Sequence, residues 1–100
     1  MADEPKRPQN PNIPIQASAR TQRGFYSNLA RVTHSPEEFV LDFLFLHHDP
    51  PFGRLGSRVL LSPAHMKRLA AALQENVSRY ETRFGVIQEH PGPEMPGGMN

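Results

Sequence analysis

Apolar and polar residues follow two different periods in the middle of the chain. Residues 39–48, FVLDFLFLHH, are rich in aromatic and branched aliphatic side chains, which is typical of a β-strand. Residues 24–34, GFYSNLARVTH, and residues 57–61, SRVLL, have the same character and predict two further strands. Residues 35–38 between the first two predict a turn, because Pro36 fixes φ at the second turn position.

The lengths of the connections predict how the strands pair. Residues 49–56, DPPFGRLG, contain two prolines and two glycines and predict a loop, since these residues interrupt a strand ladder. The short turn at 35–38 predicts an antiparallel hairpin of the first two strands. A four-residue turn there pairs His34 with Phe39, and therefore Arg31 with Asp42.

A helical period begins directly after the third expected strand. Ser62 suits the N-cap position, and Pro63 suits the first helical position, where its missing N–H is not needed. The spacing predicts a helix that runs to about Phe84, with Gly85 at its end. The apolar positions form a continuous stripe at the helical period: Met66, Leu69, Ala70, Leu73, Val77, Tyr80 and Phe84.

These elements predict an α+β fold over residues 24–87, with an antiparallel meander of three or four strands followed by one long C-terminal amphipathic helix. Residues 1–23 are rich in proline and polar residues, and residues 88–100 read QEHPGPEMPGGMN. Both tails are expected to be disordered, since neither offers enough apolar surface to offset the entropy of ordering. The folding unit of about 64 residues has a marginal core, for which oligomerisation is a common remedy.

The expected pairing makes both faces of the sheet apolar. One face suits the helix and contains Tyr26, Asn28, Ala30, Val32, Leu41, Phe43 and Phe45. The opposite face surrounds Arg31 and Asp42 with five apolar residues, which we predict to be a protein interface: Phe25, Leu29, Val40, Leu44 and Leu46. Leaving such side chains in water forfeits roughly 1.5–3 kcal/mol each. The pattern therefore predicts a homodimer or a higher homo-oligomer, or else binding of another protein. Coverage by Ile13 and Ile15 of the N-terminal tail is the alternative.

Composition narrows the classes of function. The chain contains no cysteine, which excludes disulfides and cysteine-based zinc sites. Its net charge of +1 gives no global attraction to nucleic acid or to a membrane. The longest apolar run, residues 39–46, is too short to span a membrane. We expect a soluble, cytoplasmic protein without membrane contact.

Candidate catalytic and metal-binding residues have simpler structural interpretations. His47 and His48 are adjacent on a strand and point to opposite faces, so they do not share a metal ion. Asp42 has Arg31 as its expected partner, which favours a structural ion pair over catalysis. Ser62 is explained as a helix cap. We therefore predict no catalytic residues, no metal, no cofactor and no enzymatic activity.

A cluster of cations supports a second hypothesis. Arg54, Arg58, Lys67 and Arg68 lie around the expected loop, the third strand and the start of the helix. Such a cluster, with Phe52 and His47 nearby, is suited to gripping phosphates and stacking a base of single-stranded nucleic acid. A solvated surface with scattered cations is the interpretation that we favour, given the neutral charge balance.

Several short motifs together resemble a known family. They are Tyr26-x-Asn28, the run from His34 to Phe43, Ser62-Pro63-x-His65, and Leu73-x-x-Asn76-x-x-x-Tyr80-Glu81. In this combination they resemble a family of small prokaryotic proteins called domain of unknown function 3467, which implies no activity and no site residues. At the level of fold alone, a meander closed by a helix is similar to the Pur-type single-stranded nucleic-acid-binding module and to SecB-type export chaperones or adaptors.

Overall fold

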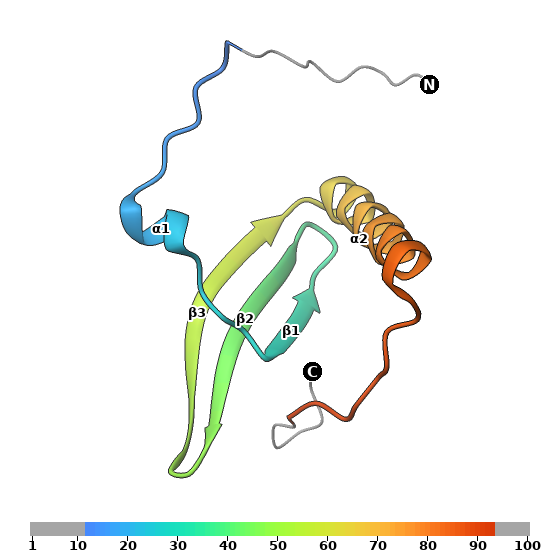
Figure 1. Cartoon of the computed structure of the whole chain (residues 1–100). Helices are drawn as coiled ribbons and strands as arrows, with labels where there is room; N and C mark the ends of the chain where they lie inside the picture. The colour runs from blue at the N-terminus through green and yellow to red at the C-terminus, as the bar shows by residue number, and fades with distance from the viewer. Residues whose placement is uncertain (1–11, 94–100) are drawn as a thin grey trace.

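The computed structural model of the chain describes residues 12–93, which form one antiparallel sheet and two helices (Figure 1). The strands are β1 (Leu29–His34), β2 (Phe39–His48) and β3 (Pro51–Leu61), and they lie in the order β1-β2-β3. The helices are α1 (Ala19–Arg23) and α2 (Pro63–Phe84). The predicted α+β class is therefore confirmed, with a three-stranded meander whose central strand is β2.

The hairpin of β1 and β2 has the predicted register. His34 lies opposite Phe39 and Arg31 opposite Asp42. The turn is closed by the Ser35 N–H, which donates to the Glu38 carbonyl oxygen at 2.9 Å. The Ser35 hydroxyl oxygen also accepts from the Glu37 N–H at 3.2 Å. Turn length and local side-chain hydrogen bonds thus set the pairing of these two strands.

The first strand is shorter than predicted, because it begins at Leu29 and not at residue 24. Just before β1, the side chain of Asn28 forms two hydrogen bonds with the backbone of Leu46, as the backbone of a paired strand residue would do. Its Nδ2 donates to the Leu46 carbonyl at 3.2 Å, and its Oδ1 accepts from the Leu46 N–H at 2.9 Å. Residues 24–28 therefore lie outside the regular ladder.

The third strand is longer than predicted, because β3 begins at Pro51 where the sequence predicted a loop over 49–56. Only Asp49 and Pro50 separate the strands, and the peptide bond between them is cis. Pro51 is tolerated as the first residue of the strand, where its missing N–H breaks no ladder. Gly56 is an extra residue in β3, since Ser57 lies opposite Phe43 and Leu55 lies opposite Leu44. This β-bulge reverses the alternation of side chains along β3.

The C-terminal helix has the predicted bounds. The Ser62 hydroxyl oxygen accepts from the His65 N–H at 3.1 Å, and Pro63 is the first helical residue. At the other end, the N–H of Gly85 donates to the Glu81 carbonyl at 2.9 Å, and Gly85 has a φ of 102°. A positive φ of this kind is easily adopted only by glycine.

The N-terminal segment contains a helix that the sequence did not predict. α1 lies within residues 1–23, for which disorder was expected, and it is capped by the Ser18 hydroxyl oxygen, which accepts from the Thr21 N–H at 3.1 Å. The expected disorder of residues 1–11 and 94–100 lies outside the described part of the chain.

The core of the described residues is small, and it lies in the sheet. Its apolar members are Leu29, Leu41, Leu44 and Leu61. α2 lies beside the sheet near the β1–β2 turn (Figure 1), and the predicted packing of its stripe on its own sheet is not formed. Ser62 is the single residue between β3 and α2, so the connection is too short to turn the helix back across the sheet. Within residues 12–93, no helix has the length and apolar character needed to cross a membrane.

Candidate functional site

One face of the sheet combines apolar rows with a group of three charges. We call it the ion-pair face. Its register pairs place Arg31 and Arg58 on either side of Asp42. The large aliphatic members of this face are Leu29, Val40, Leu44, Leu46, Leu55 and Leu60.

Asp42 is held by both neighbouring arginines. The Arg58 Nε donates to Asp42 Oδ1 at 2.7 Å, and the Arg58 NH2 nitrogen donates to Oδ2 at 3.0 Å. The Arg31 NH2 nitrogen also donates to Oδ2 at 3.0 Å. The Asp42 residue is only 4% exposed, so its charge needs these partners. The predicted Arg31–Asp42 ion pair is confirmed. Arg58 was missed as its partner, because the register of β3 was not predicted.

The pKa of Asp42 reflects this arrangement. The hydrogen bonds from Arg58, the largest effect, and those from Arg31 outweigh burial, which acts in the opposite direction, and lower the pKa from 3.8 to about 2. The same contact raises the pKa of Arg58. Two guanidinium groups and one carboxylate leave a net charge of +1 on this face. The Arg31 and Arg58 side chains are 32% and 53% exposed, so they can meet another anion.

The opposite face, which we call the aromatic face, has a different chemistry. The rings of Phe45 and His47 are 4.9 Å apart, and those of His47 and Phe52 stack at 4.5 Å. Tyr26 approaches Phe45 edge-on at 6.1 Å. These rings cover part of one another, so this face is partly protected by its own side chains.

The five predicted interface residues lie in two places. Leu29 and Leu44 are buried on the ion-pair face, and Val40 and Leu46 are half-buried on the same face. Phe25 differs, because it precedes β1 and lines a pocket with Phe43 and Ser57 of the aromatic face. Leu55 and Leu60 belong to the ion-pair face and are 45% and 57% exposed. Leu55 could not be recognised as a member of this face from the sequence, since it lies in the segment that was predicted to be a loop.

The four cations of the nucleic-acid hypothesis are not on one surface. Arg54 lies opposite Phe45, and Arg58 lies opposite Asp42, so the bulge at Gly56 puts them on opposite faces. Lys67 and Arg68 lie on α2. Of the four, Arg58 is already engaged by Asp42.

The sequence also matches a protein family over residues 1–89, described as a protein of unknown function (DUF3467). The chain belongs to this family. The resemblance seen in the short motifs is therefore confirmed. No curated protein and no solved structure matches the chain.

Within this DUF3467 chain, the motif residues stabilise the backbone at defined points. Asn28 pairs with Leu46, Ser35 closes the hairpin turn and Ser62 caps α2. Glu81 holds the segment after α2, because its Oε2 accepts from the Ile87 N–H at 2.9 Å. These motif residues therefore lie at the boundaries of the elements and stabilise them.

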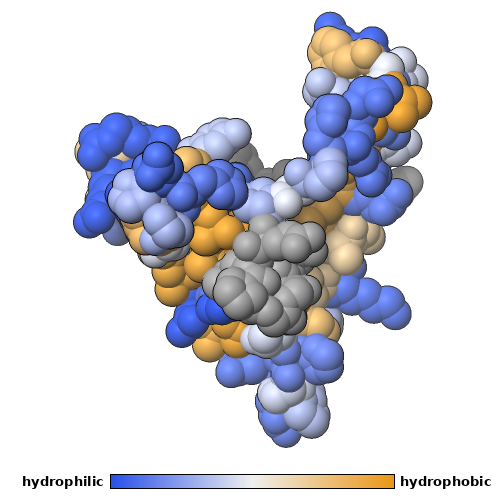
Figure 2. All heavy atoms as spheres, turned by 90° about the horizontal axis from the view of Figure 1, so that it is seen from below, coloured by the Kyte–Doolittle hydropathy of each residue, from blue (hydrophilic) through white to orange (hydrophobic). Residues whose placement is uncertain are grey.

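The apolar stripe of α2 is a further exposed apolar surface of the DUF3467 chain. All 22 residues of α2 are described, and none of them is buried. Leu73 is 56% exposed and Phe84 is 66% exposed, while Met66 and Leu69 near the sheet are half-buried. Figure 2 shows apolar side chains open at the molecular surface. The exposed members of the stripe are Leu73, Val77, Tyr80 and Phe84.

Proposed function

We propose that this protein is a non-enzymatic assembly module that forms a homodimer, in which α2 of each copy packs its stripe on the ion-pair face of the other. The observation that carries this proposal is the exposure of the whole outer part of the stripe. Leu73, Val77, Tyr80 and Phe84 are each 45–66% exposed, although they recur at the spacing of a packed helix. Among residues 12–93, a long amphipathic helix whose apolar stripe has no packing partner is the unusual feature.

Burial of apolar side chains supplies the free energy of association in this proposal. Helices in proteins are stabilised mainly by packing of their apolar face, and an isolated helix has little stability of its own. Burying a large aliphatic or aromatic side chain contributes roughly 1.5–3 kcal/mol. Four such residues on α2 and two on β3, Leu55 and Leu60, therefore offer a substantial driving force for association.

A second copy of the chain is the occupant that fits by geometry. The short connection at Ser62 keeps α2 away from its own sheet, but it does not restrict contact with another sheet. At 1.5 Å per residue, the 22 residues of α2 span about 33 Å. At about 3.3 Å per residue, the 10 residues of β2 span about the same length. The stripe therefore matches the length of the central strand.

Charge favours the ion-pair face over the aromatic face. The ion-pair face has a net charge of +1 from Arg31, Arg58 and Asp42. Glu81 lies one helical turn after Val77, at the border of the stripe, and is half-buried. Packing of the stripe brings the carboxylate of the partner's Glu81 toward the two guanidinium groups. The group then contains two positive and two negative charges, which offsets the cost of removing it from water.

The test is the mass of the full chain in solution, measured by light scattering over a range of concentrations. We expect twice the mass of one chain at high concentration. Leu73→Asp should reduce the mass to that of a single chain, because it places a charge in the middle of the stripe. Ala71→Asp adds the same charge to the same helix, two residues away and outside the stripe, and should leave the dimer intact.

Two outcomes would reject the proposal. One is a single-chain mass for the unmodified protein at all concentrations. The other is equal dissociation by Leu73→Asp and Ala71→Asp, which would indicate general damage to α2. Circular dichroism of both variants separates dissociation from unfolding, because both should retain the spectrum of the sheet.

A further inference from the structure

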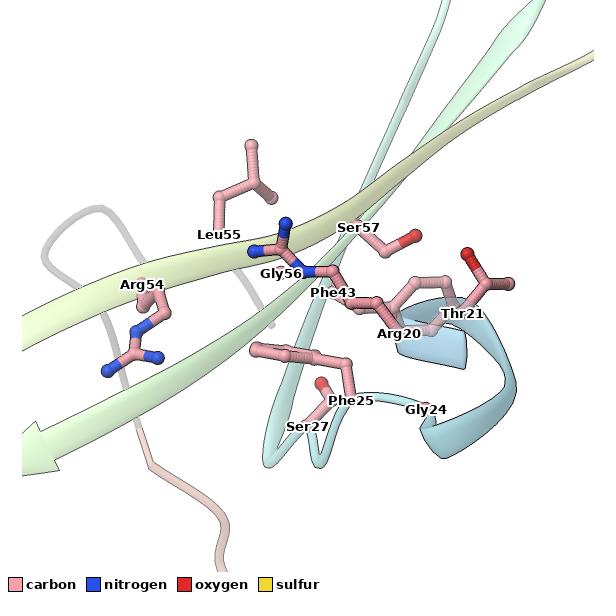
Figure 3. Close-up of a pocket in the computed structure, with 10 residues that line it drawn as sticks. All are labelled: Arg20, Thr21, Gly24, Phe25, Ser27, Phe43, Arg54, Leu55, Gly56 and Ser57. Carbon is pink, nitrogen blue, oxygen red and sulfur yellow. The ribbon is translucent and has the colours of Figure 1, made fainter. Parts of the chain in front are cut away.

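A pocket with a volume of about 510 Å³ opens where α1 and the segment before β1 meet the aromatic face. Its walls come from α1, from residues 24–27 and from the facing parts of β2 and β3 (Figure 3). Cavities of this size suit small organic molecules. Among the described residues, Leu55 is the one residue lining the pocket that also belongs to the ion-pair face, whereas the arginines and aromatic rings of the pocket lie outside the proposed dimer surface.

The β-bulge at Gly56 creates the apolar floor of the pocket. A Cβ atom at position 56 would overlap the ring of Phe25, so glycine allows this ring to lie directly on the backbone of β3. Phe43 also lines the pocket. Figure 3 shows the Phe25 ring alongside β3 at Gly56. β-bulges often occur beside binding sites, where they redirect side chains. Here the bulge brings the rings of Phe25 and Phe43 close to the backbone of β3 at Gly56.

Two arginines at the pocket have no carboxylate partner among residues 12–93. Arg20 reaches the pocket from α1, and Arg54 reaches it from β3 (Figure 3). The ion pairs of the described residues use Arg31, Arg58 and Arg79 instead. No acidic side chain lines the pocket in the part of the chain that the structure describes. The bulge is the reason that Arg54 faces the pocket, since without it Arg54 would share a face with Arg58 and Asp42.

We infer that this pocket binds a small organic anion that carries a flat apolar ring. The ring would lie against Phe25 and Phe43, because aromatic surfaces favour stacked or edge-on contact with other rings. The anionic group would accept hydrogen bonds from Arg20 or Arg54, whose guanidinium groups match phosphate and carboxylate oxygens in a bidentate manner. The hydroxyl of Ser57 supplies a neutral partner at the same wall. A nucleotide and an aromatic carboxylate share this chemistry.

Titration of the isotope-labelled full chain with two probes tests the inference by nuclear magnetic resonance. Adenosine monophosphate represents the nucleotide source, and indole-3-acetate represents the aromatic carboxylate. We expect one of them to shift the backbone signals of residues 24–27 and 54–57. Adenosine and inorganic phosphate, which supply the ring or the charge alone, should each bind at least about ten-fold more weakly than the complete probe.

Arginine substitutions test whether the probes bind in this pocket. Arg20→Gln or Arg54→Gln should weaken binding about ten-fold or more, since each removes one guanidinium donor. Arg68→Gln removes an equal charge from α2 and should leave the affinity unchanged. Three results would overturn the inference: no shift with either probe, equal weakening by Arg68→Gln, or equal binding of adenosine and adenosine monophosphate. Loss of the dimer would not produce any of these patterns, so the two proposals fail separately.

Discussion

β2 and α2 have equally clear sequence patterns, but they differ completely in burial. On β2, Leu41, Asp42 and Leu44 are buried, and most of the other residues are half-buried. On α2 no residue is buried, although its stripe is continuous from Met66 to Phe84, over about five turns. An element's formation and its burial are therefore determined by different factors. Local pattern determines which element forms, whereas burial depends on whether the connections bring a partner surface within reach.

The two elements are therefore stabilised in different ways. β2 is paired on both sides and holds the buried core, so it is fixed within a single chain. α2 has its capping hydrogen bonds at both ends and one exposed i,i+4 ion pair, Glu75–Arg79, at 2.7 Å. Exposed pairs of this kind contribute little, about 0.3–0.5 kcal/mol. The core contacts of β2 should therefore form within a single chain, whereas packing of the α2 stripe should require association.

The largest expected effect tests β2 directly. Leu41→Ala changes a residue that is 7% exposed and lies on the aromatic face, away from the proposed dimer surface, and it should lower the free energy of unfolding by about 2–5 kcal/mol. Urea unfolding at several protein concentrations measures it, and the loss should be the same at each. Leu73→Ala is the counterpart on α2 and should lose stability only where the dimer forms. A concentration-independent loss for Leu73→Ala would mean that the stripe packs within its own chain.

The next effect concerns the charge at the centre of β2. Asp42→Asn should destabilise the protein at neutral pH, because it leaves Arg31 and Arg58 without their shared carboxylate. Since the folded pKa of Asp42 is about 2 and its usual value is 3.8, this stabilisation is complete above about pH 4 and is lost as the pH falls toward 2. Urea midpoints of the two proteins should therefore converge on acidification.

The exposed carboxylate of Glu75 provides the control for that experiment. Glu75→Gln removes a charge of the same sign from the surface of α2, so its urea midpoint should follow that of the unmodified protein over the acid range. A constant gap between Asp42→Asn and the unmodified protein at all pH values would contradict the role assigned to the ion pairs.

A smaller effect distinguishes the two carboxylates of α2. Glu81→Gln should raise the dissociation constant of the dimer about ten-fold, or about 1.4 kcal/mol, because it removes the charge expected to face Arg31 and Arg58. Glutamine keeps an oxygen that can accept from the Ile87 N–H, so the local contact survives. Glu75→Gln should leave the constant within about two-fold, since Glu75 is on the far side of the helix. Sedimentation at several concentrations measures both. Equal changes in the dissociation constant for Glu81→Gln and Glu75→Gln would contradict packing of the stripe on the ion-pair face.

Structural features set by interactions between residues close in sequence could be predicted, whereas features that depend on distant contacts could not. The bounds of β2 and α2 and the Arg31–Asp42 pairing were predictable, because turn length, capping residues and periodicity are local signals. The early start of β3 was not, because a two-residue turn at Asp49 and Pro50 and a glycine bulge let a segment rich in proline and glycine continue the sheet. Composition alone predicts a loop there.

The candidate sites were predictable only where they depend on the first hairpin. Leu29, Val40, Leu44 and Leu46 share the expected face. Phe25 does not, because the Asn28 side chain ends the ladder before it. The pocket between Arg20 and Arg54 had no sequence signal, since it depends on an unpredicted helix and an unpredicted bulge. Errors of one residue in register change which face a side chain occupies, so site predictions are lost before fold predictions.

The smallest predicted effect uses the cap of α2 to compare the helix alone with the helix in the dimer. Ser62→Ala removes the oxygen that accepts from the His65 N–H and should destabilise α2 by about 1 kcal/mol. At dilutions where the chains are separate, helix content measured by circular dichroism should fall, because capping supports a helix that lacks packing. At concentrations where the dimer forms, packing of the stripe should restore the helix. A loss of helix that is equal at both concentrations would show that α2 gains nothing from association.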